Sequence, residues 1–273
     1  FSRSTFRNCF DNGYDKTYSQ VVRRYVDNGT GKQNSELISQ IYNVLREGYR
    51  NEYYYKNTLL NKLLLGIHSV NTTTALTEIP IAKSKADFVL INGKAVVYEI
   101  KTELDNFDRL ENQINDYYKA FDHVAVVTCK ENLQVLKKKI EMIGKPVGIY
   151  ILQKRGTITT IQKPQAYSVE LDAEILFKIL RKQEYEEILF NKYKHLPDVS
   201  EFKYYSECKK MFLEIPLEEA YLSVLKLLKK RSQIIKDEFS KIPYELKFLA
   251  YFMNLKSDYK KITKFLNESY GGV

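Results

Sequence analysis

Three charged residues, Asp87, Glu99 and Lys101, lie in stretches whose other residues are mostly apolar. Two neighbouring carboxylates repel one another unless a cation lies between them, and Mg²⁺ prefers carboxylate and carbonyl oxygens. Lys101 follows Glu99 by two residues, so both side chains would point to the same side of a strand. Its ammonium could position an attacking water or stabilise charge that develops on a phosphate. A structural salt bridge is the alternative interpretation.

The Glu-x-Lys spacing by itself is not specific, because it occurs four times in the chain. One pair, Glu99/Lys101, is embedded in the apolar stretch 95–100, where a charge needs a partner or a function. The other three lie in polar, helix-like stretches that are typical of a solvated surface: Glu201/Lys203, Glu207/Lys209 and Glu245/Lys247.

Hydrophobic periodicity predicts the elements that would position these residues. Helices are expected over 35–47, capped by Ser35, and over 52–65, capped by Asn51. Alternation then predicts a hairpin around Asn92-Gly93. In chain order the strands are expected at 73–82, 86–91, 95–101, 123–128, 147–152 and 157–161, with helices at 107–121 and 131–143 and an almost wholly helical region from 171 onward.

The hairpin connection decides whether the three residues can form one site. A two-residue loop at Asn92-Gly93 would place Asp87 and Glu99 on opposite faces of the sheet. A three-residue loop over 91–93 would place Asp87 opposite Val97, on the same face as Glu99 and Lys101. Gly93 suits the left-handed position that such a loop requires. We therefore predict a three-residue loop or a strand bulge, with the two carboxylates close enough to share one cation.

Composition excludes several classes of protein. The chain has 273 residues, 44% of them hydrophobic and 28% charged, as in ordinary globular proteins. No apolar run is long enough to span a membrane, and residues 1–20 contain no signal-peptide core. Three widely separated cysteines argue against a disulfide framework and against structural zinc. We expect a cytoplasmic protein without a membrane partner, whose start is trimmed because it lacks an initiator Met.

The formal net charge is +9, and most of it lies in the first part of the sequence. Residues 1–167 carry a balance of +7, and residues 168–273 carry +2. A positive field of this size is consistent with a polyanionic partner such as nucleic acid. Lys outnumbers Arg in the chain, so the positive charge could instead reflect the base composition of the source.

The segment 85–127 resembles the core of the PD-(D/E)xK nuclease superfamily, which has the restriction-endonuclease-like fold. Asp87 matches the Asp of its second strand, and Glu99-Ile100-Lys101 matches the (D/E)xK of its third. Gln113 and Tyr117 match the Gln-xxx-Tyr motif of the RecB-like branch. The stretch 98–127 is most similar to a small, poorly characterised bacterial subset. Ala86 stands where the family name has Pro, which removes no ligand. The resemblance covers about residues 50–130.

This resemblance implies roles for the matched residues. Asp87, Glu99 and the backbone carbonyl of Ile100 would bind Mg²⁺, with Mn²⁺ able to substitute, and Glu52 would add a further ligand. Lys101 would position the nucleophilic water. Gln113 and Tyr117, four residues apart on one helix face, would support Lys101 or contact the phosphate backbone. Core packing is an equal alternative for Tyr117.

Several further candidate residues have more than one interpretation. Glu78 could replace Glu52 as the accessory acid. Asp105 and Asp108 lie at the start of the 107–121 helix and are expected to cap it, while Arg109 could reach a phosphate. The run 137–139 of three lysines is most simply a solvated helix face, and contact with DNA is the alternative interpretation.

We therefore predict an α/β protein with a restriction-endonuclease-like core, a mixed sheet flanked by helices, and a C-terminal all-helical region. The expected domains are an N-terminal extension 1–33, a nuclease core 34–165 and a helical domain 166–273. The predicted function is Mg²⁺-dependent hydrolysis of phosphodiester bonds, with DNA favoured over RNA. The family resemblance alone implies a defence or mobile-element setting. The alternative is a catalytically silent module of the nuclease fold that binds nucleic acid or another protein. The helical region could also bind a protein partner or a second copy of the chain.

Overall fold

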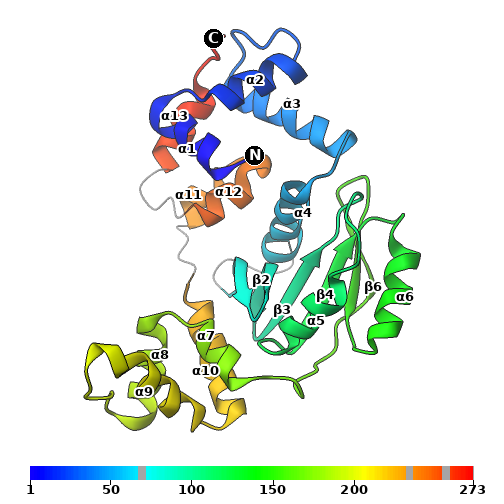
Figure 1. Cartoon of the computed structure of the whole chain (residues 1–273). Helices are drawn as coiled ribbons and strands as arrows, with labels where there is room; N and C mark the ends of the chain where they lie inside the picture. Colours follow the sequence, from blue (N-terminus) through cyan, green and yellow to red (C-terminus); the bar gives the residue numbers. More distant parts are fainter. Residues whose placement is uncertain (67–71, 232–235, 254–258, 273) are drawn as a thin grey trace. The chain divides into compact units, whose positions relative to one another are not determined.

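The computed structural model describes residues 1–66, 72–231, 236–253 and 259–272 (Figure 1). The chain forms two compact units, each built from separate segments. Unit 1 comprises 1–70, 153–158 and 233–273, and unit 2 comprises 71–152 and 159–232. This division differs from the predicted domains 1–33, 34–165 and 166–273, because the last helices of the chain pack with the first ones.

Unit 1 is helical. Its elements are α1 (Arg3–Asn12), α2 (Lys16–Tyr25), α3 (Asn34–Glu47), α4 (Glu52–Leu59), the π-helix η1 (Leu60–Leu65), α11 (Lys236–Ser240), the 3₁₀ turn η2 (Tyr244–Leu246), α12 (Lys247–Phe252) and α13 (Tyr259–Asn267). The expected helix over 52–65 is therefore α4 continued by a π-helical turn. Asn51 caps α4 as predicted, since its side chain accepts a hydrogen bond from the Tyr54 amide. Helix α13 contacts α1 and α3, and α12 contacts α4 and η1.

Residues 1–33, which were predicted to be an N-terminal extension, contain two capped helices, α1 and α2. The Ser2 side chain caps α1, and the Asp15 side chain accepts hydrogen bonds from two amides at the start of α2. The buried ring of Phe6 contacts those of Phe10 and Tyr18, and Phe10 and Tyr18 each contact Phe265 of α13. Helices of about ten residues are marginal alone, so this packing between the two ends of the chain stabilises them.

Unit 2 contains the sheet. Its strands, in the order β1-β2-β3-β4-β5-β6, are β1 (Thr74–Ile81), β2 (Ser84–Asn92), β3 (Lys94–Ile100), β4 (His123–Thr128), β5 (Gly148–Leu152) and β6 (Ile158–Gln162). The first three strands pair antiparallel, and β3, β4 and β5 pair parallel. The expected mixed sheet is therefore present. All six residues of β4 are buried, which is typical of an interior parallel strand.

The β2–β3 hairpin has the odd-numbered connection that the site requires. Asn92 pairs with Lys94 across Gly93, whose φ of 73° is left-handed. The structure confirms that Asp87 and Glu99 lie on the same face of the sheet, but the predicted register of the hairpin was wrong. Phe88 pairs with Tyr98, and continuing the register by one residue places Asp87 opposite Glu99 rather than opposite Val97.

Helices cover the sheet of unit 2. The crossover helix α5 (Leu110–Tyr118) connects β3 to β4, and α6 (Leu133–Ile143) connects β4 to β5. The helices α7 (Ala173–Lys178), α8 (Lys182–Tyr193), α9 (Glu201–Leu213) and α10 (Leu217–Lys229) contribute to the same hydrophobic core as the sheet. Tyr221 of α10, for example, donates a hydrogen bond to the Asp122 carboxylate just before β4. Among the described residues, no helix has both the length and the apolar character of a membrane span.

Candidate active site

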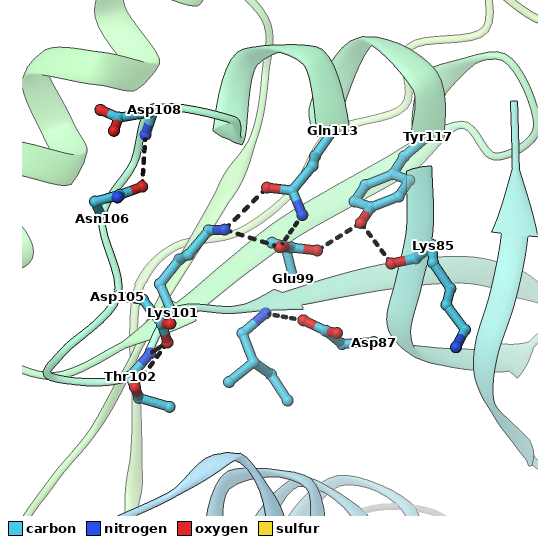
Figure 2. A network of polar contacts seen from close by, with 11 residues as sticks. Lys85, Asp87, Glu99, Lys101, Thr102, Asp105, Asn106, Asp108, Gln113 and Tyr117 are labelled. Carbon is cyan, nitrogen blue, oxygen red and sulfur yellow. Dashed lines mark hydrogen bonds and ion pairs between the residues drawn. The ribbon is translucent and has the colours of Figure 1, made fainter. Parts of the chain in front are cut away.

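Strands β2 and β3 and helix α5 bring together five of the predicted site residues (Figure 2). Asp87 lies on β2, Glu99 lies on β3, and Lys101 directly follows β3. Gln113 and Tyr117 lie one turn apart on α5, which packs on the sheet. The predicted grouping of strand residues with the Gln-xxx-Tyr pair is thus present in the structure.

Glu99 is the centre of this network. Its side chain is only 2% exposed, although it is a carboxylate. Gln113 Nε2 donates to Oε1 at 2.5 Å, and Lys101 Nζ lies 3.1 Å from the same oxygen. The Tyr117 hydroxyl lies 2.5 Å from Oε2. Donors thus reach both carboxylate oxygens, and this satisfies a charge that would otherwise be costly to bury.

Lys101 is held from two sides. Besides its ion pair with Glu99, Nζ donates to Gln113 Oε1 at 2.9 Å, so the Gln113 amide bridges the two charges. The Lys101 backbone amide donates to Val127 O on β4 at 2.9 Å. The residue is 6% exposed, and its ammonium therefore has a fixed position.

Tyr117 is fully buried and serves both packing and hydrogen bonding. Its hydroxyl lies 3.0 Å from Lys85 O and can donate its single proton either there or to Glu99. Burial, together with the negative charge of Glu99, raises the pKa of Tyr117 well above its ordinary value. The phenol consequently stays protonated and acts as a donor.

Asp87 is oriented toward the backbone of β3. Its Oδ2 accepts a hydrogen bond from the Ile100 amide at 2.9 Å, so its carboxylate lies beside the peptide whose carbonyl was predicted to be a metal ligand. A carboxylate oxygen of Glu78, on the neighbouring strand β1, lies within 4.8 Å of one on Asp87. These oxygens are the donor type that Mg²⁺ and Mn²⁺ prefer.

The backbone of β1 is irregular at Glu78. Thr77 pairs with Phe88 and Ile79 pairs with Ala86, but Glu78 between them has a φ of +58°. A non-glycine residue in this region is strained and is often found at functional sites. Glu78 also forms an ion pair of 2.6 Å with Lys85.

Two further predicted site residues lie on other parts of the chain. Glu52 is the first residue of α4 in unit 1, where it pairs with Lys56 at 2.5 Å. Its predicted role as a ligand stays a prediction. Arg109 is exposed at the N-cap position of α5, and its contact with a phosphate also stays a prediction.

The segment after Lys101 differs from its expected role. Asp105 was expected to cap the following helix, but α5 begins only at Leu110. Asp105 Oδ2 instead accepts from the Thr102 amide at 2.7 Å and from the Thr102 hydroxyl at 2.6 Å. Asn132 Nδ2 donates to Thr102 O at 3.1 Å. This turn fixes the chain next to Lys101. The three-residue spacing of Thr102 and Asp105 is the sequence signal that could have indicated it.

The fold and site define an α/β protein whose mixed sheet carries a buried, hydrogen-bonded carboxylate–lysine pair. A family model described as "Bacteriophage P4 protein cII" matches residues 46–249, about three quarters of the chain. The chain therefore belongs to the bacteriophage P4 protein cII family.

The "Protein cII" of Enterobacteria phage P4 is 24% identical over 143 residues. That match covers 50% of this chain and 49% of the phage protein, so the chain spans about half the length of this relative. No solved structure matches the chain. The descriptions of this family and this relative name no reaction.

Proposed function

We propose that the protein is a metal-dependent nuclease of the PD-(D/E)xK type that hydrolyses phosphodiester bonds, with DNA favoured over RNA. The observation that carries this proposal is the buried Glu99–Lys101 pair beside Asp87. A buried charged pair at the end of an apolar strand is costly, and well-packed apolar residues would serve stability at least as well. Its retention next to a second carboxylate therefore favours a chemical role.

In this proposal Asp87, Glu99, the Ile100 carbonyl and Glu52 would hold Mg²⁺ or Mn²⁺, with Glu78 as an alternative to Glu52. The oxygen donors of Glu78 and Asp87 fit these ions, since both prefer carboxylates. A bound divalent ion would lower the pKa of a water and neutralise phosphate charge.

The side chains of the protein would contribute positioning and charge. The Lys101 ammonium would hold the attacking water and stabilise the charge that develops on the phosphate oxygens. Attack of this water forms a new phosphorus–oxygen bond, and the bond to the leaving oxygen breaks. Gln113 and Tyr117 would keep Lys101 and Glu99 in place through the hydrogen bonds described above. Arg109 would contact the backbone of the substrate.

The contacts of Glu99 also favour a second candidate, a catalytically silent module that binds nucleic acid or protein. Both oxygens of Glu99 already have donors within the protein, as expected for a purely structural pair. The two candidates differ in one respect. A catalytic site needs a divalent cation, whereas the structural pair is complete without one.

The setting is part of the proposal. We place the protein in the cytoplasm of a bacterial cell, in a mobile-element or defence context. Its three cysteines are free and buried, which is consistent with this location. A protein partner or a second copy could bind through the C-terminal helices, where Phe202 of α9 is 95% exposed.

Cleavage of a substrate panel tests the activity. Supercoiled plasmid, linear duplex DNA, single-stranded DNA and RNA would each be incubated with Mg²⁺, with Mn²⁺ and with EDTA. We expect cleavage of DNA only with a divalent ion, and its loss in Glu99→Gln and Lys101→Met. Metal-dependent cleavage that both variants retain, or no cleavage under any of these conditions, would contradict the nuclease assignment.

A further inference from the structure

Nearly all of the net positive charge belongs to unit 1, although the proposed chemistry lies in unit 2. Unit 1 contains 19 Lys and Arg residues against 11 Asp and Glu residues, a balance of +8. Unit 2 contains 24 against 23, a balance of +1. A polyanion is therefore attracted mainly to the helical unit.

Helix α2 presents a concentrated basic face. Its ten residues include Lys16, Arg23 and Arg24 and no acidic residue. These three side chains are exposed together with Thr17 and Gln20. At 3.6 residues per turn the five positions span an arc of about 120°, and the buried residues of α2 lie opposite. In the described part of the chain, neither Lys16 nor Arg23 has an ion-pair partner, so their charges are not neutralised internally.

The protein holds this helix in a fixed position. The turn from α1 to α2 is three residues long, and Gly13 at its start is left-handed, with a φ of 72°. The carboxylate of Asp15 caps α2 and also accepts a hydrogen bond from Asn8 of α1 at 2.9 Å. On the buried side, the Tyr18 hydroxyl donates to Asn34 of α3 at 2.8 Å. Two short helices joined in this way have the connectivity of a helix–turn–helix unit.

We propose that α2 docks into the major groove of duplex DNA. Lys16, Arg23 and Arg24 would contact phosphates and base edges, and Gln20 would face the groove between them. Duplex DNA complements the positive charge of this face. It also fits in size, because the major groove is about 12 Å wide and admits one α-helix. Helix α2 lies outside residues 46–249, the part of the chain that the family model matches. The docking does not depend on the proposed cleavage activity.

Binding in EDTA separates this inference from cleavage. Fluorescence anisotropy would measure the affinity of the full chain for a labelled mixed-sequence duplex at several salt concentrations. The test variant is Lys16→Gln/Arg23→Gln, which removes two exposed charges that make no ion pair within the described residues. The matched control is Lys137→Gln/Lys138→Gln on α6, which removes two exposed charges from unit 2.

We expect the α2 variant to bind duplex DNA at least about tenfold more weakly than the wild type. The slope of log affinity against log salt should fall by about 1.8, since each phosphate contact contributes about 0.9. The α6 variant should bind within about twofold of the wild type. Circular dichroism would confirm that both variants are folded, and Arg24→Gln supplies a second test of the same face.

Three outcomes would overturn the proposal. The first is an equal loss of affinity in the two double variants, and the second is no loss in the α2 variant. The third is tighter binding of single-stranded DNA or RNA than of duplex DNA of the same length, which would point to stacking on exposed aromatic side chains. Absence of cleavage would leave this result unaffected and would contradict only the nuclease proposal.

Discussion

The ammonium of Lys101 lies 3.1 Å from Oε1 of Glu99, and both side chains are almost fully buried. The amide of Gln113 contacts both groups, so the pair is held by a third side chain from another element. A buried ion pair of this kind makes each charge dependent on the other.

Removal of Lys101 alone should therefore destabilise unit 2. In Lys101→Met the apolar stem is retained but the Glu99 carboxylate loses its cation. We expect a loss of about 3–5 kcal/mol in the free energy of unfolding. The double variant Glu99→Gln/Lys101→Met should recover most of this loss, because no unpaired charge remains. Urea unfolding measures both, and wild-type stability in the single variant would contradict the buried pair.

The Tyr117 hydroxyl should contribute through its bond to Glu99. Tyr117→Phe keeps the buried ring and removes the donor to Oε2. Hydrogen bonds to charged groups contribute about 1.5–3 kcal/mol, so we expect a loss of this size. Tyr118→Phe is the matched control, because this neighbouring tyrosine is equally buried and its ring contacts Tyr167. Equal losses in the two variants would show that the Glu99 contact contributes nothing specific.

A divalent cation should stabilise the protein against heat. Oxygens of Glu78 and Asp87 lie within 4.8 Å of one another, and a bound cation would relieve their repulsion. We expect millimolar Mn²⁺ or Mg²⁺ to raise the Tm of the wild type without DNA. The shift should disappear in Asp87→Asn and persist in Glu141→Gln, which changes an exposed acid on α6. A thermal scan without any shift in the wild type would argue against a preformed site.

Alkaline pH should destabilise the protein. Burial raises the pKa of Tyr53 in unit 1 and of Tyr117 in unit 2 above the ordinary value of 10.0. Below that value the phenols are protonated in both the folded and the unfolded chain. Above it only the unfolded chain releases these protons, so the free energy of unfolding falls as the pH rises beyond about 10.

Tyrosinate absorbance and circular dichroism during an alkaline titration would test this expectation. The buried tyrosines should ionise together with the loss of helix. Reversible ionisation of all 22 tyrosines near pH 10, with the fold intact, would contradict the assignment of buried phenols.

The strands and crossover helices of unit 2 were predictable because their apolar periodicity is strong and local. The face shared by Asp87 and Glu99 followed from the parity of a hairpin containing Gly93. The register of the hairpin could not be predicted in the same way. A connection of one residue and a connection of three residues place Asp87 and Glu99 on the same face, so the pattern does not distinguish them. The left-handed backbone of Glu78, which lies between two residues of β1 that pair with β2, has no sequence signal.

The organisation of unit 1 could not be predicted from local patterns. Helices α1 and α2 are short, and their buried rings pack on Phe265 near the other end of the chain. Asn34 likewise donates to the carbonyls of Phe265 and Glu268. Contacts across more than 200 residues leave no periodicity in either segment alone. The helical C-terminal region was expected as one domain, but its helices are divided between the two units.

The initial rate of Mn²⁺-dependent plasmid cleavage in Asp87→Asn, compared with Glu141→Gln, tests the central claim most directly. Both variants remove one negative charge from a side chain of unit 2, and only Asp87 contacts the Ile100 amide beside Glu99. We expect Glu141→Gln to cleave at the wild-type rate. Asp87→Asn should be at least about 100-fold slower, which is typical for the loss of one group that stabilises a transition state. A folded Asp87→Asn protein that cleaves as fast as Glu141→Gln would contradict the nuclease site.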